Sequence, residues 1–115
     1  LPLTEQTKTI INSESLELVN NGAVLINAGR GGLIRDSDLL KALDGGKLSA
    51  CTLDVFNEEP LPPQHPFWHH DKVTVTPHIS APTRLKSSIR SILKNISRIK
   101  KGLQPIGLVE KERHY

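Results

Sequence analysis

The stretch from Val24 to Gly32, VLINAGRGG, constrains the fold more than any other part of this sequence. A short apolar run that ends at glycines is typical of a buried strand in a parallel sheet, although periodicity alone leaves a helix open. In open α/β sheets, ligands bind beyond the carboxyl ends of the strands. Arg30 follows this run, and its guanidinium is suited to hold a carboxylate through two hydrogen bonds. A solvated arginine in a surface turn is the competing interpretation.

The order of the remaining elements predicts an α/β fold with half of a doubly wound parallel sheet. A strand–helix–strand unit of this length is typical of a parallel crossover. Asn12 or Ser13 is suited to cap the first helix, and glycines end the others. No G-x-G-x-x-G occurs in the 115 residues, so the usual pyrophosphate-binding turn is absent from this stretch. The expected strands are 23–27, 48–56 and 73–76, and the expected helices are 14–20, 37–43 and 83–101, with a loop at 57–71.

Charge divides the chain into two parts. Residues 1–82 carry six Lys/Arg against ten Asp/Glu, whereas residues 83–115 carry nine against two. We therefore expect one domain over 1–82 and a separate basic helix with its tail over 83–115. Such a helix is suited to nucleic acid or to an acidic membrane, but no aromatic residues interleave with its charges. We expect a solvated charged face, an apolar stripe packed on another domain, and neither nucleic acid nor membrane as partner.

Cysteine and methionine usage bears on the compartment and on the origin of the chain. The single cysteine, Cys51, excludes an internal disulfide, which fits a reducing, cytoplasmic location. Its neighbours predict a packing role in a buried strand. The 115 residues contain no methionine, and residues 1–4 lack the basic start of a signal peptide. We expect a processed product, an isolated domain or a fragment.

Three polar residues follow the three expected strands, each just beyond the strand's end. They are Arg30, Glu59 and His78. If the strands are parallel neighbours, these side chains converge on one edge of the sheet. His78 is suited to transfer a proton, Glu59 to hold its ring, and Arg30 to bind a carboxylate and polarise a carbonyl. None of them supplies a hydride, so redox chemistry needs a cofactor.

Two further interpretations concern the histidine-rich loop. A zinc site is conceivable from His65, His69, His70 and His78. Structural zinc needs three or four convergent ligands, commonly with cysteine, so we expect no metal. Trp68 is expected to anchor the loop by packing.

Four segments, in order and at matching spacings, resemble the D-isomer-specific 2-hydroxyacid dehydrogenases. They are LPLT at 1–4, INAGRG at 26–31, LDVFNEEPLP at 53–62 and TPHIS at 76–80. Within that family, HPFW at 65–68 and the ending from Gly107 to Tyr115 are similar to the bacterial glyoxylate/hydroxypyruvate reductase A group. The resemblance implies the second half of a Rossmann-like sheet, and a C-terminal helix that packs on a substrate domain outside this stretch.

The resemblance also implies NAD(P)H-dependent reduction of a 2-oxo acid, such as glyoxylate or hydroxypyruvate, to the D-2-hydroxy acid. By this likeness, Arg30 binds substrate, His78 is the general acid/base and Glu59 supports it. Asp54 contacts the nicotinamide amide, and the glycines near Arg30 leave clearance for the nicotinamide ring. The implied cofactor-binding residues are Leu1, Pro2, Thr7, Ala28, Arg30, Asp54, His78 and Ser80.

NADPH is favoured over NADH by the resemblance alone, as is a homodimer. Because the phosphate-binding half is outside this stretch, we expect the isolated chain to be inactive. The competing function is a non-catalytic, dinucleotide-sensing protein like the corepressors that resemble this family.

Overall fold

The computed structural model describes residues 1–109, so the end of the expected tail, 110–115, lies outside the described residues. The chain forms two compact units. Leu1–Ser80 make the first, and the residues from Ala81 onward make the second.

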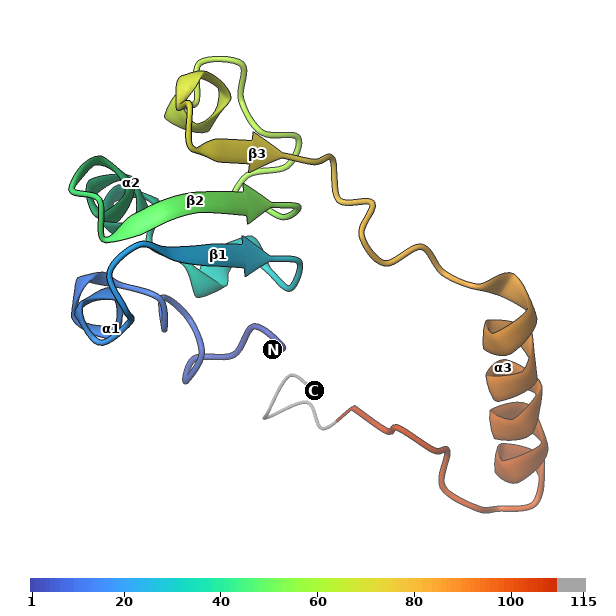
Figure 1. The fold of residues 1–115 in the computed structure, drawn as a ribbon. Coiled ribbons are helices and arrows are strands. Elements are labelled where there is room, and N and C mark those ends of the chain that lie inside the picture. The colour runs from blue at the N-terminus through green and yellow to red at the C-terminus, as the bar shows by residue number, and fades with distance from the viewer. Residues whose placement is uncertain (110–115) are drawn as a thin grey trace. The chain divides into compact units, whose positions relative to one another are not determined.

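The first unit is built on three parallel strands in the order β1-β2-β3, as predicted (Figure 1). They are β1 (Ala23–Asn27), β2 (Leu48–Leu53) and β3 (Val73–Val75). Leu53 lies between Asn27 and Val75 in the register, so all three strands end at one level. β2 was expected to reach Phe56. It ends at Leu53 because neither neighbouring strand continues beyond that level.

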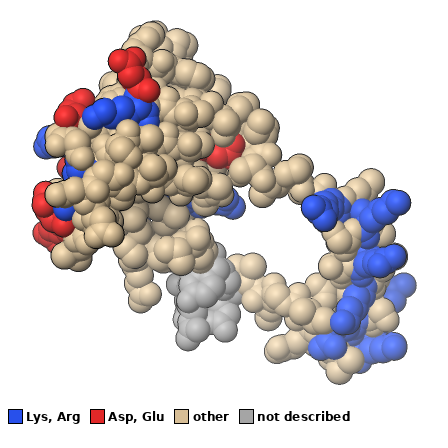
Figure 2. Space-filling model, in the orientation of Figure 1, with Lys and Arg blue, Asp and Glu red and all other residues tan. Residues whose placement is uncertain are grey.

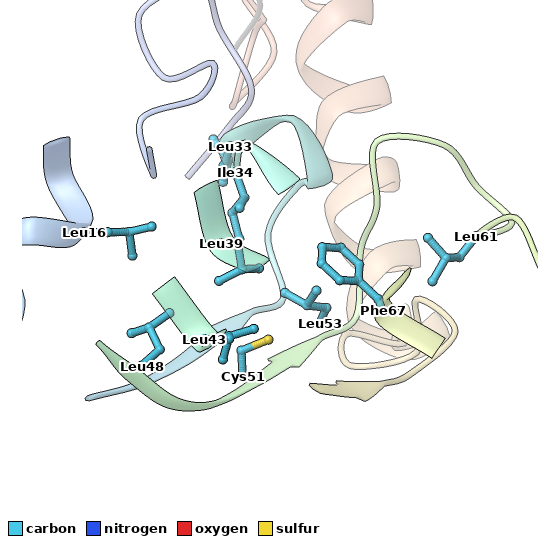
Figure 3. Packing of buried hydrophobic residues seen from close by; sticks show 10 residues of the cluster. All are labelled: Leu16, Leu33, Ile34, Leu39, Leu43, Leu48, Cys51, Leu53, Leu61 and Phe67. Carbon is cyan, nitrogen blue, oxygen red and sulfur yellow. The ribbon is translucent and has the colours of Figure 1, made fainter. Parts of the chain in front are cut away.

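Helix α2 (Asp36–Asp44) packs on β2 and closes the core (Figure 3). Its Leu39 and Leu43 are 0% exposed, and Leu48 and Leu53 meet them from the sheet. Full burial of one such side chain contributes about 1.5–3 kcal/mol to folding. Cys51 is buried in the same cluster, as the sequence predicted.

The opposite side of β1 is not covered within this unit. Val24 and Ile26 are 62% and 72% exposed, whereas the neighbouring Leu25 packs against the core. Strands with apolar residues on both sides are typical of parallel sheets covered on both faces. The expectation of a fully buried strand is therefore met on one face only.

Helix α1 (Ser13–Glu17) starts at the predicted cap and ends early. The Asn12 side chain accepts from the Ser15 backbone, and the Ser15 hydroxyl oxygen accepts from the Asn12 backbone in return. The helix was expected to reach residue 20. It stops because Leu16 is its only buried side chain, and Lys47 Nζ donates to the free Glu17 carbonyl at 2.9 Å.

The loop after β2 contains a short 3₁₀ helix, η2 (Pro66–His69), and its anchor differs from expectation. Trp68 is 49% exposed, and its indole N–H donates to the Pro62 carbonyl at 3.0 Å. Phe67, 3% exposed, fills the core instead. The prediction for Trp68 as the packing anchor was wrong, because the 3₁₀ turn directs the neighbouring ring inward.

The second unit consists of α3 (Leu85–Lys100) and the segment that follows it. Gly102, at φ 69°, ends the helix as predicted, and the Leu103 N–H closes the cap on the Arg98 carbonyl. Lys and Arg side chains gather along this helix (Figure 2). The six residues of its apolar stripe are all at least 44% exposed: Leu85, Ile89, Ile92, Leu93, Ile96 and Ile99. No helix among residues 1–109 is long and apolar enough to cross a membrane.

Burial raises the pKa of the Cys51 thiol to about 11. The thiolate is the reactive form, so labelling by a disulfide reagent at pH 8 should be about 100-fold slower in the folded protein than in urea. Mass spectrometry of the peptide that carries Cys51 measures both rates. Between about pH 9 and 11 the Cys51 thiol ionises in the unfolded chain but stays protonated in the folded one. The free energy of unfolding should therefore fall as the pH rises through this range. Equal labelling rates would contradict the burial.

Candidate active site

The turn after β1 is fixed by a buried asparagine. Asn27, 8% exposed, donates from Nδ2 to the Arg30 carbonyl at 3.0 Å, and its Oδ1 accepts from the Gly29 N–H at 3.1 Å. These bonds satisfy polar backbone groups and place Arg30 at the end of the sheet. Sequence reasoning missed Asn27. The signal was a polar residue at the end of an apolar strand, directly before Ala-Gly.

The glycines that follow serve close packing of the chain on itself. A Cβ on Gly31 would lie 1.9 Å from the carbonyl carbon of Phe56, and one on Gly32 would meet the Leu3 side chain at 2.8 Å. Both glycines therefore face protein atoms. Both glycines also line the hollow that contains Arg30 and His78, so clearance for a nicotinamide ring stays a prediction beside this packing role.

Glu59 and His78 form a hydrogen-bonded pair at the same edge. His78 Nδ1 lies 2.8 Å from Glu59 Oε2, and the Phe56 N–H donates to Glu59 Oε1 at 2.9 Å. The hydrogen bond from His78, followed by that from the Phe56 backbone, lowers the pKa of the Glu59 carboxyl from its usual value. An ionised Glu59 accepts only, so Nδ1 carries the proton of this bond and Nε2 is left for chemistry.

The segment that carries His78 is attached to Asp54, the first residue after β2. Asp54 is 2% exposed; Oδ1 accepts from the Thr76 hydroxyl and from the Ile79 N–H at 3.0 Å, and Oδ2 accepts from the Ser80 N–H at 2.9 Å. Hydrogen bonds from Ser80 and then Thr76 hold the pKa of the Asp54 carboxyl well below its usual range. Asp54 is thus an anion at neutral pH.

His78 has an uncommon backbone conformation. Its φ is 54°, in the left-handed region that few residues other than glycine adopt. Such a residue costs about 1–3 kcal/mol and persists only where its surroundings hold it. Strain of this kind concentrates at functional sites.

Arg30, Glu59 and His78 line one hollow of about 400 Å³ with Lys8 and Phe56. The structure therefore brings the three predicted residues together, each on the loop after a different strand. Within the structure, Arg30 Nη1 donates to its neighbouring Gly29 carbonyl at 2.8 Å, and its side chain is exposed. Three basic groups and one carboxylate around a hollow of this size fit a small anion with an acidic hydrogen-bond donor beside it.

The expected cofactor residues divide between several places. Leu1 and Ala28 line a hollow of about 450 Å³ along β1. The Thr7 hydroxyl donates to the Pro2 carbonyl at 2.7 Å, so Thr7 fixes the bend at the start of the chain. The Ser80 N–H donates a hydrogen bond to the Asp54 carboxylate. The role of each toward a dinucleotide stays a prediction.

Two of the three histidines of the loop have separate carboxylate partners. His65 Nε2 lies 3.5 Å from Asp36, and His70 Nε2 lies 3.2 Å from Asp44. Among residues 1–109, no group of three or more His, Cys, Asp or Glu is placed to hold a metal ion.

Asp36 supports the Glu59 loop from the first turn of α2. Its Oδ1 accepts from Asn57 Nδ2 at 3.0 Å, while its Oδ2 faces the His65 ring. One carboxylate therefore contacts the loop on both sides of Glu59.

Comparison with known proteins identifies this arrangement. Residues 1–80 match the family model described as "D-isomer specific 2-hydroxyacid dehydrogenase, NAD binding domain". The chain belongs to the D-isomer-specific 2-hydroxyacid dehydrogenase family. Members of this family are oxidoreductases, and residues 1–80 are part of an NAD-binding domain.

Solved structures of 2-hydroxyacid dehydrogenases superpose closely on the chain. A Xanthobacter autotrophicus Py2 member, in complex with NADPH and MES, has 38% identity and a TM-score of 0.94 over 100% of this chain and 48% of its own. A Sinorhizobium meliloti NADPH-dependent glyoxylate/hydroxypyruvate reductase, in complex with NADP and sulfate, has 38% identity and a TM-score of 0.91. The match covers 100% of this chain and 38% of the reductase. A Klebsiella pneumoniae 342 member has 42% identity and a TM-score of 0.85, and the match covers 96% of this chain and 36% of that protein. The chain spans less than half the length of each.

The residues present fit the nicotinamide end of the family's cofactor. The hollow along β1 contains Ala28 and has apolar walls that suit a flat ring, and His78 lies at the same edge of the sheet. A glycine-rich phosphate-binding turn is not among the 115 residues. The 2-hydroxyacid dehydrogenase chain therefore fits one half of a dinucleotide.

Replacing Gly31 with alanine should disrupt the site. The added Cβ must displace the Phe56 backbone, which carries the N–H that holds Glu59. We expect a loss of about 3 kcal/mol or more in the free energy of unfolding of the full-length protein.

Gly29→Ala is the matched control, because its Cβ would meet no atom closer than the Leu33 methyl at 3.3 Å. That variant should lose less than about 1 kcal/mol. Urea denaturation of both proteins measures the difference. Equal stability of the two variants would disprove the close approach of Gly31 to Phe56.

Proposed function

We propose that this chain provides the proton-transfer and carboxylate-binding groups of an NAD(P)H-dependent reductase of small 2-oxo acids that forms D-2-hydroxy acids. The observation that supports this most is the single hollow lined by Arg30, Glu59 and His78. A guanidinium, an imidazole and the carboxylate that orients it are protein groups suited to bind a 2-oxo acid and to protonate its carbonyl while a cofactor supplies the hydride.

The residues act in distinct ways. Arg30 binds the substrate carboxylate and polarises the neighbouring carbonyl. A reduced nicotinamide, when bound, supplies the hydride to the carbonyl carbon. His78 gives the proton on Nε2 to the carbonyl oxygen, so the C=O bond becomes CH–OH. Glu59 accepts the Nδ1 proton of His78 in a hydrogen bond, which orients the ring and stabilises its charged form.

We propose glyoxylate and hydroxypyruvate as substrates and NADPH as the preferred cofactor. The hollow of about 400 Å³ is small, and Lys8 and Arg30 both line it, as suits a short anion. The similar Sinorhizobium meliloti enzyme is described as a glyoxylate/hydroxypyruvate reductase in complex with NADP, and the Xanthobacter enzyme is in complex with NADPH.

We also propose that the remaining parts of the site come from residues outside this stretch. The exposed apolar stripe of α3 packs on the substrate domain, and a phosphate-binding turn completes the cofactor site. The isolated chain is inactive for that reason, and the full-length enzyme forms a homodimer.

In the full-length enzyme, Arg30→Ala and His78→Gln should each lower kcat/KM for glyoxylate by about 10²–10⁴-fold, because each removes a group that acts in the transition state. NADPH oxidation at 340 nm measures the rate. Affinity for NADPH, measured by calorimetry without substrate, should change far less.

Matched controls come from the same chain. Arg35→Ala removes an arginine paired with Asp38, and His70→Gln a histidine paired with Asp44, both outside the hollow. Both should retain turnover. Full activity of Arg30→Ala and His78→Gln would disprove the assignment, and dinucleotide binding without any turnover by the wild type would favour a sensing protein.

Glu59→Gln keeps an acceptor for the Nδ1 proton but removes the charge, whereas Glu59→Ala removes both. We expect kcat to fall about tenfold in the first variant and about 100-fold in the second. Glu58→Gln is the control, since Glu58 is the adjacent exposed carboxylate and does not line the hollow. Steady-state kinetics at pH 7 test the order. A larger fall in kcat for Glu58→Gln than for Glu59→Gln would assign the support of His78 to Glu58 and not to Glu59.

A further inference from the structure

We propose that Asp54 is the positioning residue of His78: its carboxylate holds the backbone of residues 76–80 in the conformation that presents the imidazole to Glu59 and to the hollow. The term "positioning" rests on the proposed function, in which His78 transfers the proton. Geometry alone supports the mechanical part of the inference.

Three hydrogen bonds bracket His78 from both sides. The Thr76 hydroxyl, two residues before it, donates to Asp54 Oδ1, and the Ile79 N–H, one residue after it, donates to the same oxygen at 3.0 Å. The Ser80 N–H donates to Oδ2 at 2.9 Å. The acceptor is the residue directly beyond the central strand, whose own N–H is bonded to the Asn27 carbonyl at 2.9 Å. Asp54 therefore connects the His78 segment to the end of the central strand.

His78 needs such a restraint. Its φ of 54° is unfavourable for a side chain with a Cβ, and its ring is 50% exposed, so packing contributes little to hold it. Its own N–H bonds to the Thr76 carbonyl at 3.1 Å, and the Thr76 N–H bonds to the Leu53 carbonyl at 2.9 Å, so the backbone links the sheet only to the residues before His78. The bonds that Ile79 and Ser80 donate to Asp54 are the ones that hold the backbone after His78.

This role differs from direct contact with the nicotinamide amide, the role that the resemblance implies for Asp54. The carboxylate is 2% exposed, and both of its oxygens already accept protein donors. The two roles can be separated by measuring how much kcat falls on replacing Asp54 in an enzyme whose His78 is already replaced.

The first test uses the full-length enzyme with two substitutions of different severity. Asp54→Asn keeps the shape but turns one acceptor oxygen into a donor. Thr76→Val removes one of the three bonds and leaves Asp54 intact, so it remains informative if Asp54→Asn fails to fold. Both should lower kcat, Asp54→Asn by about 100-fold, because a small displacement of a catalytic group has an effect of that order. NADPH affinity should be retained.

Thr76→Ser and Thr74→Val are the matched controls. Serine restores the donated hydroxyl and should restore kcat. Thr74 is an exposed threonine of β3, two residues before Thr76, that makes no hydrogen bond to Asp54, and its replacement should leave kcat unchanged. Loss of NADPH affinity with unchanged kcat in Thr76→Val and Asp54→Asn would overturn the proposal.

A double-mutant cycle separates the two roles. If Asp54 acts through His78, Asp54→Asn should add little further loss of kcat in a His78→Gln enzyme. An undiminished, additive loss would assign Asp54 to the cofactor and overturn the proposal.

The second test needs no activity. In apo full-length protein with ¹⁵N-labelled histidine, NMR should show a protected proton on His78 Nδ1 from its bond to Glu59. Asp54→Asn and Thr76→Val should lose this signal, and Thr74→Val should retain it. If the signal survives in both variants, the proposal is wrong. If it is lost in them while the wild-type enzyme reduces no 2-oxo acid, the restraint stands and the proposed function falls.

Discussion

The common end point of the three parallel strands is the constraint on which the site depends. Asn27, Leu53 and Val75 are side by side in the register, so the next residues of three distant segments emerge at one edge. Hydrogen bonding between strands fixes that level to within one residue. Each loop then needs only a short distance to bring its functional group to the shared hollow, and the core on α2 keeps the strands in place.

Polar residues at the strand ends convert this coarse alignment into a defined geometry. Asn27 holds the turn of Arg30, and Asp54 holds the segment of His78. Both are buried, and their polar atoms are satisfied by backbone groups just beyond the strands and, for Asp54, also by the Thr76 hydroxyl. Removal of either leaves buried donors or acceptors without partners, which is costly in a protein interior. The exposed groups that do chemistry are thus supported by buried ones that do none.

Much of this architecture is predictable from the sequence. The strand–helix–strand spacing predicts the parallel order, and the Gly-rich and Pro-containing ends predict where Arg30 and His78 leave the sheet. Local pattern fails where tertiary contacts decide. Phe67 and Trp68 are neighbouring aromatic residues that both suit a packing role, and the 3₁₀ turn determines which ring is buried. The glycines beside Arg30 suggest a ligand, but Gly31 is required by the Phe56 backbone, 25 residues further along the chain. Such contacts leave no trace in the local spacing.

The attachment of the Glu59 loop to α2 has a consequence for engineering. Asp36 contacts Asn57 before the glutamate and His65 after it, so a side chain of α2 holds these two points of the loop together. A loop with different substrate preference, transplanted from a related enzyme, would bring its own sequence but not this anchor. Successful grafts should therefore exchange position 36 together with the loop, and the first turn of α2 becomes part of the unit that evolution or design must replace as a whole.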